Sequence, residues 1–329
     1  MVHVRRARTD DAAAMRAAHL AAVRTTSRSH YAEADVAAWA ARIGEEAYDD
    51  DFARRDVVVA EEAGRVVGFG VLDAGDAEIR AIYVHPEAGR RGVGRRLLAA
   101  LETIGRLRGL GGLRLESSLN AVPLYAGAGW RRGAGTRRTF PGGRDIRCVE
   151  MTKALAPLRL DVREEHDGDA AAIGAVERAA FGQPGEAALV EGLRAAGALA
   201  VSLVAVLDDV IVGHAALSPV EVAGGRRVLG LGPVAVLPAC QACAVGSRLV
   251  EEGLARAGER GALAVVVLGD PAYYARFGFV PASRFGIRYP GPVPDEAFMA
   301  AELVPDALAE AAGAVRYHPA FEAVVPTPR

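Results

Sequence analysis

A segment of 20 residues occurs twice in this chain, and this repeat constrains the fold more than any other feature. Residues 79–98 read IRAIYVHPEAGRRGVGRRLL, and residues 231–250 read LGPVAVLPACQACAVGSRLV. Each copy predicts an apolar strand, a turn at a proline, a loop of small residues and an amphipathic helix. At a constant offset of 152, the recurring residues are Val84, Pro86, Val93, Gly94, Arg96 and Leu97, which reappear as Val236, Pro238, Val245, Gly246, Arg248 and Leu249.

A second repeated block lies downstream of the first. Residues 124–130 (LYAGAGW) are matched by residues 273–279 (YYARFGF) at an offset of 149. Because order, spacing and residue type all repeat, the chain is predicted to hold two homologous domains in tandem. A length of 329 residues also favours two domains. We place the domains at residues 1–153 and 159–329, and the linker at residues 154–158, with Pro157 as the breaker.

Composition excludes several classes of protein. The three cysteines are too few for a disulfide framework, so a cytoplasmic location is expected. No apolar run reaches the roughly 18 residues that span a bilayer, and MVHVRRARTDD is not a signal peptide. No HExxH motif or paired CxxC set is present, so no metal site is predicted.

The charge is divided unequally between the two halves. Residues 1–153 carry 25 Lys and Arg against 20 Asp and Glu, a balance of +5, and the remainder carries 14 against 21, a balance of −7. The first half is therefore the better candidate for binding a polyanion. A basic stripe with interleaved aromatic residues is absent, so no nucleic-acid partner is expected.

Hydrophobic periodicity predicts an α/β fold in each half, with helices on both faces of a mixed sheet. The Pro- and Gly-rich tail, residues 285–329, has no expected counterpart in the first half. In the first half, strands are predicted at 2–7, 57–61, 66–72, 78–84, 113–116, 130–138 and 147–152, and helices at 10–25, 31–43, 92–108 and 121–128. In the second half, strands are predicted at 158–162, 200–207, 210–220, 228–236 and 262–268, and helices up to 196 and at 244–257.

A strand that leads through a small-residue turn into a helix forms an anion site, because unpaired backbone N–H groups point outward and the helix dipole adds positive charge. The chain has neither GxGxxG after its first strand nor a Gly-rich loop ending in GK[ST]. A dinucleotide-binding fold and a P-loop NTPase are therefore excluded. The chain also has no GxSxG motif, which excludes that type of hydrolase.

The loop instead resembles the acyl-CoA loop of the GNAT superfamily of N-acyltransferases, whose pattern is [Q/R]-x-x-G-x-[G/A]. Residues 89–94 match it in the first half and residues 241–246 in the second, and the Tyr125 and Tyr274 segments resemble the following Y-x-x-x-G-[F/W] element. The resemblance implies two tandem GNAT-like domains, each a mixed, mostly antiparallel sheet flanked by helices. It implies acetyl-CoA contacts at Ile82, Tyr83, Val84, Gly89, Arg90, Arg91, Gly92, Val93, Gly94, Arg95 and Asn120.

Both loops depart from the family pattern. The first has Gly89 where Gln or Arg is usual, although Arg90 and Arg91 keep positive charge beside it. The second keeps Gln241 but has Ala244 at the first glycine position. A Cβ there is expected to crowd a pyrophosphate or to disfavour a positive φ.

The resemblance implies direct transfer of an acetyl group from acetyl-CoA to an amine. A backbone N–H of residues 82–84 would stabilise the thioester oxyanion. Tyr125 would protonate the leaving thiolate, and Glu78 would act as the base. Tyr125 can also be read as a packing residue and Glu78 as a solvated carboxylate. At offset 152 Glu78 corresponds to Gly230, so the second domain lacks this acid.

Four other features have two interpretations each. A thiol of the Cys240–Cys243 pair, at a helix start, can be reactive or can simply fill a disused loop. His85 is expected to cap the strand end rather than act as a base. Tyr31 and Trp39 either line an acceptor pocket or are core aromatics.

We predict a cytoplasmic N-acetyltransferase with the chemistry in the first domain and a degenerate second domain. The expected partner is a small-molecule amine acceptor, with no nucleic acid and no membrane, and the chain is expected to be a monomer or homodimer. Two alternatives are kept. In one, both domains are active, as in tandem enzymes such as mycothiol synthase. In the other, the chain is a non-catalytic sensor that binds acyl-CoA.

Overall fold

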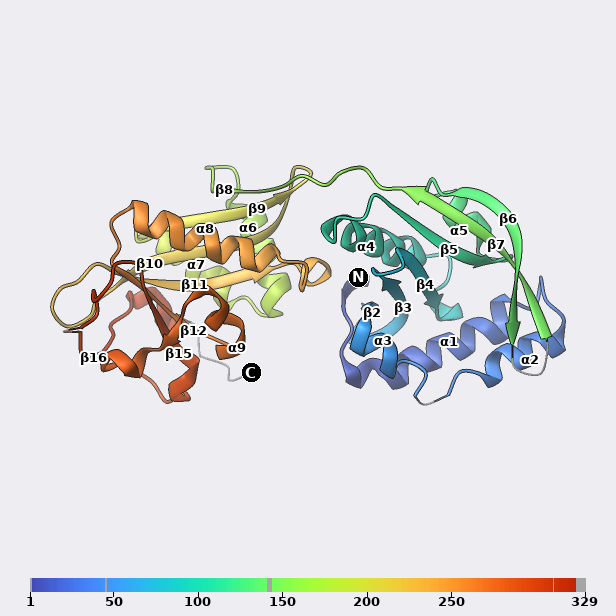
Figure 1. Ribbon diagram of the computed structural model, residues 1–329, viewed down its shortest axis with the longest axis horizontal. Coiled ribbons are helices and arrows are strands. Elements are labelled where there is room, and N and C mark those ends of the chain that lie inside the picture. The colour runs from blue at the N-terminus through green and yellow to red at the C-terminus, as the bar shows by residue number, and fades with distance from the viewer. Residues whose placement is uncertain (1, 45, 141–143, 310, 324–329) are drawn as a thin grey trace. The chain divides into compact units, whose positions relative to one another are not determined.

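The computed structural model describes residues 2–44, 46–140, 144–309 and 311–323. The chain forms two compact units, residues 1–158 with 238–243 and residues 159–237 with 244–329. Each unit contains a seven-stranded sheet (Figure 1). Within the described residues, no helix has the length and apolar character needed to cross a membrane.

The first sheet has the strand order β1-β2-β3-β4-β5-β7-β6. All neighbouring strands are antiparallel except β4 and β5, which are parallel. The strands are β1 (Val2–Arg6), β2 (Asp56–Glu62), β3 (Arg65–Asp73), β4 (Glu78–Val84), β5 (Gly112–Ser118), β6 (Arg131–Phe140) and β7 (Arg144–Ala154), and the helices are α1 (Ala12–Thr26), α2 (Glu33–Ala41), α3 (Asp49–Arg54), α4 (Val93–Leu107) and α5 (Val122–Ala126).

Helices cover both faces of this sheet, because alternate side chains of a strand point to opposite faces and both sets are apolar here. On one face, Leu97 and Leu101 of α4 are buried with Tyr125 and Trp130. On the other face, Met15 of α1 packs against β2 and β3. Figure 1 shows α4 and α1 on opposite sides of the strands.

The second sheet repeats this topology in the order β8-β9-β10-β11-β12-β15-β13. Its strands are β8 (Leu160–Glu164), β9 (Val201–Leu207), β10 (Val210–Val220), β11 (Val228–Val236), β12 (Ala264–Leu268), β13 (Val280–Pro281) and β15 (Phe298–Glu302), and the helices of this unit are α6 (Ala170–Phe181), α7 (Gly185–Ala195), α8 (Val245–Glu259) and α9 (Pro271–Tyr274). β14 (Ile287–Arg288) and β16 (Gly313–Ala314) form a separate two-stranded sheet. The predicted fold class, two tandem mixed sheets flanked by helices, is confirmed.

The two parallel strands separate at the centre of each sheet. β4 and β5 are paired at one position only, Glu78 with Arg114. β11 and β12 are paired from Val228 to Leu231, although β11 continues to Val236. The later parts of β4 and β11 therefore have a partner strand on one side only, and each sheet opens at this point.

Side-chain hydrogen bonds repeat between the units as well as strand order. The Arg5 guanidinium donates to both carboxylate oxygens of Asp11 at 2.7 and 2.9 Å, and Arg163 does the same to Asp169 at 2.6 and 3.3 Å. Helices α4 and α8 repeat a second contact, since Arg96 donates to a carbonyl oxygen of the first strand and Arg248 donates to the Leu160 carbonyl oxygen. These bonds support duplication of a whole domain rather than of a single motif.

Two expectations about secondary structure were incomplete. Helix α3 was not predicted, because its sequence DDDFAR is too short and too polar to show an apolar period. The tail does have a counterpart in the first half, because β15 pairs antiparallel with β12 as β7 pairs with β5. A Pro- and Gly-rich insertion before β15 hid this correspondence from the sequence comparison.

The repeated ion pairs also show which residues of α1 and α6 correspond to each other. At one pair of corresponding positions, the two helices have different titratable side chains. At the offset of 158 set by Asp11 and Asp169, His19 of α1 corresponds to Glu177 of α6. The His19 ring stacks on Tyr83 with centroids 3.7 Å apart, and its Nδ1 lies 2.9 Å from the Tyr48 hydroxyl. Glu177 Oε1 instead lies 2.6 Å from Nδ1 of His214, and both of these side chains are fully buried.

We expect His19 to make the first unit sensitive to acid. Burial lowers its pKa from 6.5 to about 3, so below about pH 6.5 the unfolded chain takes up a proton that the folded unit does not. Stability therefore falls as the pH drops from about 6.5 towards 3. Between pH 7.5 and pH 5 the loss is on the order of 2 kcal/mol, and His19→Phe should remove it.

Urea unfolding followed by tryptophan fluorescence at the two pH values measures this loss. Both tryptophans, Trp39 and Trp130, lie in the first unit, so the signal reports on that unit alone. His30→Phe, at an exposed position, is the matched control and should keep the pH dependence. An unchanged pH dependence in His19→Phe would contradict the assignment.

Candidate active site

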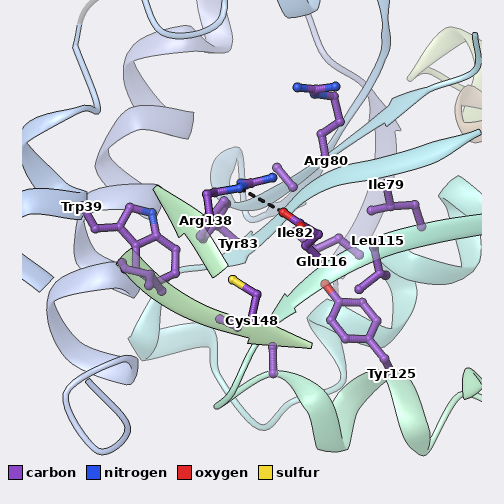
Figure 2. A pocket seen from close by; sticks show the side chains of 14 residues that line it. Trp39, Ile79, Arg80, Ile82, Tyr83, Leu115, Glu116, Tyr125, Arg138 and Cys148 are labelled. Carbon is purple, nitrogen blue, oxygen red and sulfur yellow. Dashed lines mark ion pairs between the residues drawn. The ribbon is translucent and has the colours of Figure 1, made fainter. Parts of the chain in front are cut away.

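A pocket passes through the opening between β4 and β5 in the first unit (Figure 2). Ile82 and Tyr83 of β4 and Leu115 of β5 line it. Its wall also includes Tyr125, from the core on the α4 face, and Trp39, from the α2 face. The pocket is therefore lined by residues from both faces of the sheet.

The backbone of β4 presents hydrogen-bond donors to this opening. The His85 N–H donates to the Val67 carbonyl oxygen of β3 at 2.8 Å. Backbone amides alternate in direction along an antiparallel strand, so the Tyr83 N–H also faces β3, whereas the N–H groups of Ile82 and Val84 face β5. Because β5 does not pair there, these two amides are available to a ligand.

Tyr125 lies at the wall of the pocket on the α5 side, and its ring packs edge-on against Trp130 with centroids 5.9 Å apart. The side chain is 6% exposed, and burial raises the pKa of its phenol well above the ordinary value of 10. The hydroxyl therefore stays protonated at neutral pH, which is the state that a proton donor requires.

Of three other residues predicted near the site, two have side chains available to a ligand and one has a structural role. Asn120 has a buried side-chain carbonyl oxygen without a hydrogen-bond partner, so this oxygen can accept a bond from a ligand N–H. Trp39 lines the pocket. Tyr31 instead has a structural role, because its hydroxyl donates to the Arg147 carbonyl oxygen at 2.7 Å and accepts from the Leu119 N–H at 2.8 Å.

The predicted anion loop leads into a 15-residue helix, α4. Gly92 is the N-terminal cap residue in the left-handed conformation (φ 81°), and no side chain caps the first turn. The first N–H groups of α4 are therefore free of side-chain bonds and can bind an anion. Arg90 also has a positive φ, 58°, so the loop turns twice before the helix begins.

Three further residues of the loop have defined contacts. The guanidinium of Arg91 makes a forked ion pair with the Glu62 carboxylate. At Gly89 a Cβ would lie 2.9 Å from the Pro86 carbonyl oxygen, so the folded backbone leaves no room for the usual Gln or Arg side chain. His85 accepts a hydrogen bond from the Glu87 N–H at 3.4 Å, as expected for a structural cap.

The two acidic residues near the opening have different surroundings. Glu78, the predicted base, lies at the start of β4 within 3.6 Å of Arg80 and 3.5 Å of Arg114, and it does not line the pocket. Glu116 of β5 does line the pocket. Sequence reasoning missed Glu116, because its position depends on how far β4 and β5 separate and no motif encodes that distance.

The second loop keeps the backbone conformation of the first. Ala242 has φ 57°, matching Arg90, and Ala244 caps α8 with φ 63°, matching Gly92. Ala244 therefore adopts the positive φ that its Cβ was expected to disfavour, and the second loop keeps the turn of the first without a glycine at this position. Cys240 and Cys243 are buried free thiols, and burial raises the pKa of Cys240 to about 11, which argues against a reactive thiolate.

Ala244 still carries a conformational cost, since a left-handed residue with a Cβ is disfavoured by about 1 kcal/mol. We expect Ala244→Gly to stabilise the second unit and Gly92→Ala to destabilise the first by about that amount. A Cβ at Gly92 meets no atom within 4 Å, so the cost there is one of conformation, not of clash. Tryptophan fluorescence measures the first unit, and calorimetry measures both transitions. The prediction requires changes in the free energy of unfolding that have opposite signs in the two variants.

The comparisons with known proteins identify the class. A model described as the acetyltransferase (GNAT) domain matches residues 27–155, and a model of the acetyltransferase (GNAT) family matches residues 174–279. The chain therefore belongs to the GNAT family of N-acetyltransferases and holds two such domains in tandem, as the sequence predicted.

Particular relatives agree with this assignment. The uncharacterized N-acetyltransferase YhbS of Escherichia coli K12 is 40% identical over 162 residues, which is 49% of this chain and 97% of YhbS. The uncharacterized N-acetyltransferase YjhQ of the same strain is 37% identical over 134 residues, covering 39% of this chain and 74% of YjhQ.

Among solved structures, E. coli YhbS in complex with CoA has a TM-score of 0.49 and 40% identity, covering 51% of this chain and 94% of that chain. A GNAT acetyltransferase from Brucella melitensis in complex with acetyl-CoA has a TM-score of 0.43 and 40% identity, covering 50% of this chain and 98% of that chain. The described residues contain no group of three or more His, Cys, Asp or Glu side chains that could hold a metal ion.

Proposed function

We propose that this protein transfers the acetyl group of acetyl-CoA to the amine of a small molecule, with the chemistry in the first unit. The observation that carries the proposal is the pocket between β4 and β5, which joins the two faces of the sheet beside Tyr125. The uncapped N-terminus of α4 at Gly92 would hold the pyrophosphate on one side. The acceptor would enter on the side of Trp39.

Each step of the transfer has a candidate group. The N–H groups of Ile82 and Val84 face the opening, where they would stabilise the negative charge that develops on the thioester oxygen. The buried phenol of Tyr125 would give a proton to the leaving thiolate. Glu116 is the carboxylate in the pocket, so we assign it the role of base in preference to Glu78. Asn120 would bind an N–H group of the cofactor.

The test is the release of free CoA thiol from acetyl-CoA by the full-length protein with a panel of small amines, together with a calorimetric titration with acetyl-CoA. Amine-dependent thiol release and one binding site per chain are expected. Binding of acetyl-CoA without turnover would indicate a sensor in place of an enzyme, and the absence of binding would overturn the proposal.

A second candidate function, in which both units act, is favoured by a specific observation. The second loop repeats the torsions of the first at Ala242 and Ala244, and the sheet of that unit opens at the corresponding place. The correspondence of Gly230 to Glu78 carries little weight against it, because Glu78 lies outside the first pocket. Two acetyl-CoA sites per chain in the same titration would support this candidate.

A further inference from the structure

The acceptor side of the pocket contains a carboxylate and a guanidinium that face each other. Glu116 Oε2 on β5 lies 3.3 Å from Nε of Arg138 on β6, and Figure 2 shows both at the pocket. Their partners on β7, Glu150 and Ile146, are four residues apart, so both side chains lie on the same face of the sheet. That face carries Trp39.

This ion pair remains open to solvent. The Glu116 side chain is 33% exposed and that of Arg138 is 38% exposed. Exposed pairs of this kind contribute little to stability, about 0–1 kcal/mol. Both groups therefore keep capacity to bind a ligand, the carboxylate through its second oxygen and the guanidinium through its terminal N–H groups.

The charge of the pocket favours an acceptor that carries an anionic group. Besides Glu116 and Arg138, the pocket is lined by Arg80, which is 39% exposed and whose charge is offset by Glu78, Asp73 and Asp76 at 3.6–3.9 Å. A ligand that carries only a positive charge would pair with Glu116 and leave the Arg138 guanidinium without an anionic partner. A zwitterion would satisfy both members of the pair.

We propose that the acceptor is a small amino acid, a primary amine that carries a carboxylate. This inference rests on the proposed function and names the substrate class of the same site. The ammonium group binds Glu116, and the carboxylate takes forked hydrogen bonds from the Arg138 guanidinium, a geometry that arginine favours. The carbon skeleton lies against Trp39 and Ile146, which also line the pocket.

The reaction balances with these groups. Glu116 accepts one proton from the ammonium group and passes it to solvent. The free amine forms the N–C bond to the acetyl carbon, and the thioester C–S bond breaks with its electron pair on sulfur. Tyr125 protonates the thiolate, and the second proton lost by the nitrogen restores the phenol. The products are the N-acetyl amino acid, CoA with a free thiol, and one proton.

The first experiment compares each of several small amino acids with its carboxamide and with the amine that lacks the carboxylate. The full-length protein and acetyl-CoA are used, and thiol release is followed. The amino acid should exceed its carboxamide in kcat/KM by at least about 10-fold, because a charged hydrogen bond is lost in the amide. If the amide or the simple amine equals or exceeds the amino acid, this inference is overturned while the acetyltransferase assignment stands. If no amine is acetylated, the proposed function itself fails.

The second experiment uses matched variants and the ratio of kcat/KM for the amino acid to that for its carboxamide. Arg138→Gln should bring this ratio close to 1, because it removes the charge that distinguishes the two acceptors. Arg137→Gln is the control, since Arg137 is the adjacent residue of the strand, is 70% exposed and contacts Asp145. A ratio that stays high in Arg138→Gln, or that falls equally in Arg137→Gln, would contradict the role of Arg138.

Discussion

Substitution of Gly92 by aspartate is expected to abolish binding of acetyl-CoA at the first unit. The new carboxylate would lie at the uncapped N-terminus of α4, where the proposal places the pyrophosphate. Like charges in contact cost several kcal/mol, so a loss of affinity of about 10²-fold or more should follow. Calorimetric titration of the full-length variant with acetyl-CoA measures this loss.

The control for this variant is Gly92→Asn, which has nearly the same size and lacks the charge. Both asparagine and aspartate tolerate the left-handed conformation of this position better than most residues. A Cβ at Gly92 has open space around it, so both variants should fold. We expect Asn to retain affinity within about 10-fold of the original protein, since the repulsion is absent. An equal loss of affinity in both variants would show that the loop conformation, and not the charge, causes the effect. Unchanged affinity in Gly92→Asp would show that acetyl-CoA does not bind at this loop.

Substitution of Tyr125 by phenylalanine is expected to lower turnover by about 10²-fold with little change in acetyl-CoA affinity. The ring would keep its packing against Trp130, and only the hydroxyl is lost. Because burial raises the pKa of this phenol, the activity of the original protein should show no loss between pH 7 and pH 9 from ionisation of Tyr125. Single-turnover kinetics across this range tests both statements.

The chain provides its own matched control for this variant. Tyr274 of the second unit corresponds to Tyr125, is half-buried, and packs edge-on against Phe279 with centroids 5.7 Å apart. If the chemistry belongs to the first unit, Tyr274→Phe should leave turnover within about 2-fold, since no proton donor of the reaction is removed. A large fall in Tyr274→Phe with little change in Tyr125→Phe would move the catalytic centre to the second unit.

The sequence was sufficient to predict what depends on local pattern. The strand at 78–84 and the helix near 92–108 were predicted almost to the residue, because a β-branched run and a helical apolar period are read directly from the chain. The repeat predicted two homologous domains, which the strand orders and the family matches confirm. Tyr125 and Ile82 were predicted as site residues from their place in the motif, and both lie at the pocket.

What the sequence did not reveal depends on register and on backbone torsion. Glu116 and Arg138 are 22 residues apart, and they meet only because β5 and β6 both pair with β7 and place them on the same face. No local pattern encodes that pairing. A Cβ at Ala244 was expected to disfavour a positive φ, and the folded chain nevertheless holds this residue at φ 63°. In both cases the folded structure, and not a local sequence pattern, determines the outcome.

The single paired position between β4 and β5 divides the first sheet into two ribbons, β1–β4 and β5–β7. All other neighbouring strands of this sheet share five or more paired positions. Where β4 and β5 separate, two strand edges face each other and their backbone groups lack strand partners. A bound molecule with amide groups can therefore supply the hydrogen bonds that are missing between these edges. With such a molecule bound, the two ribbons would unfold together as one cooperative unit. Amide exchange would then be slower along both edges, and the melting temperature of the unit would be higher.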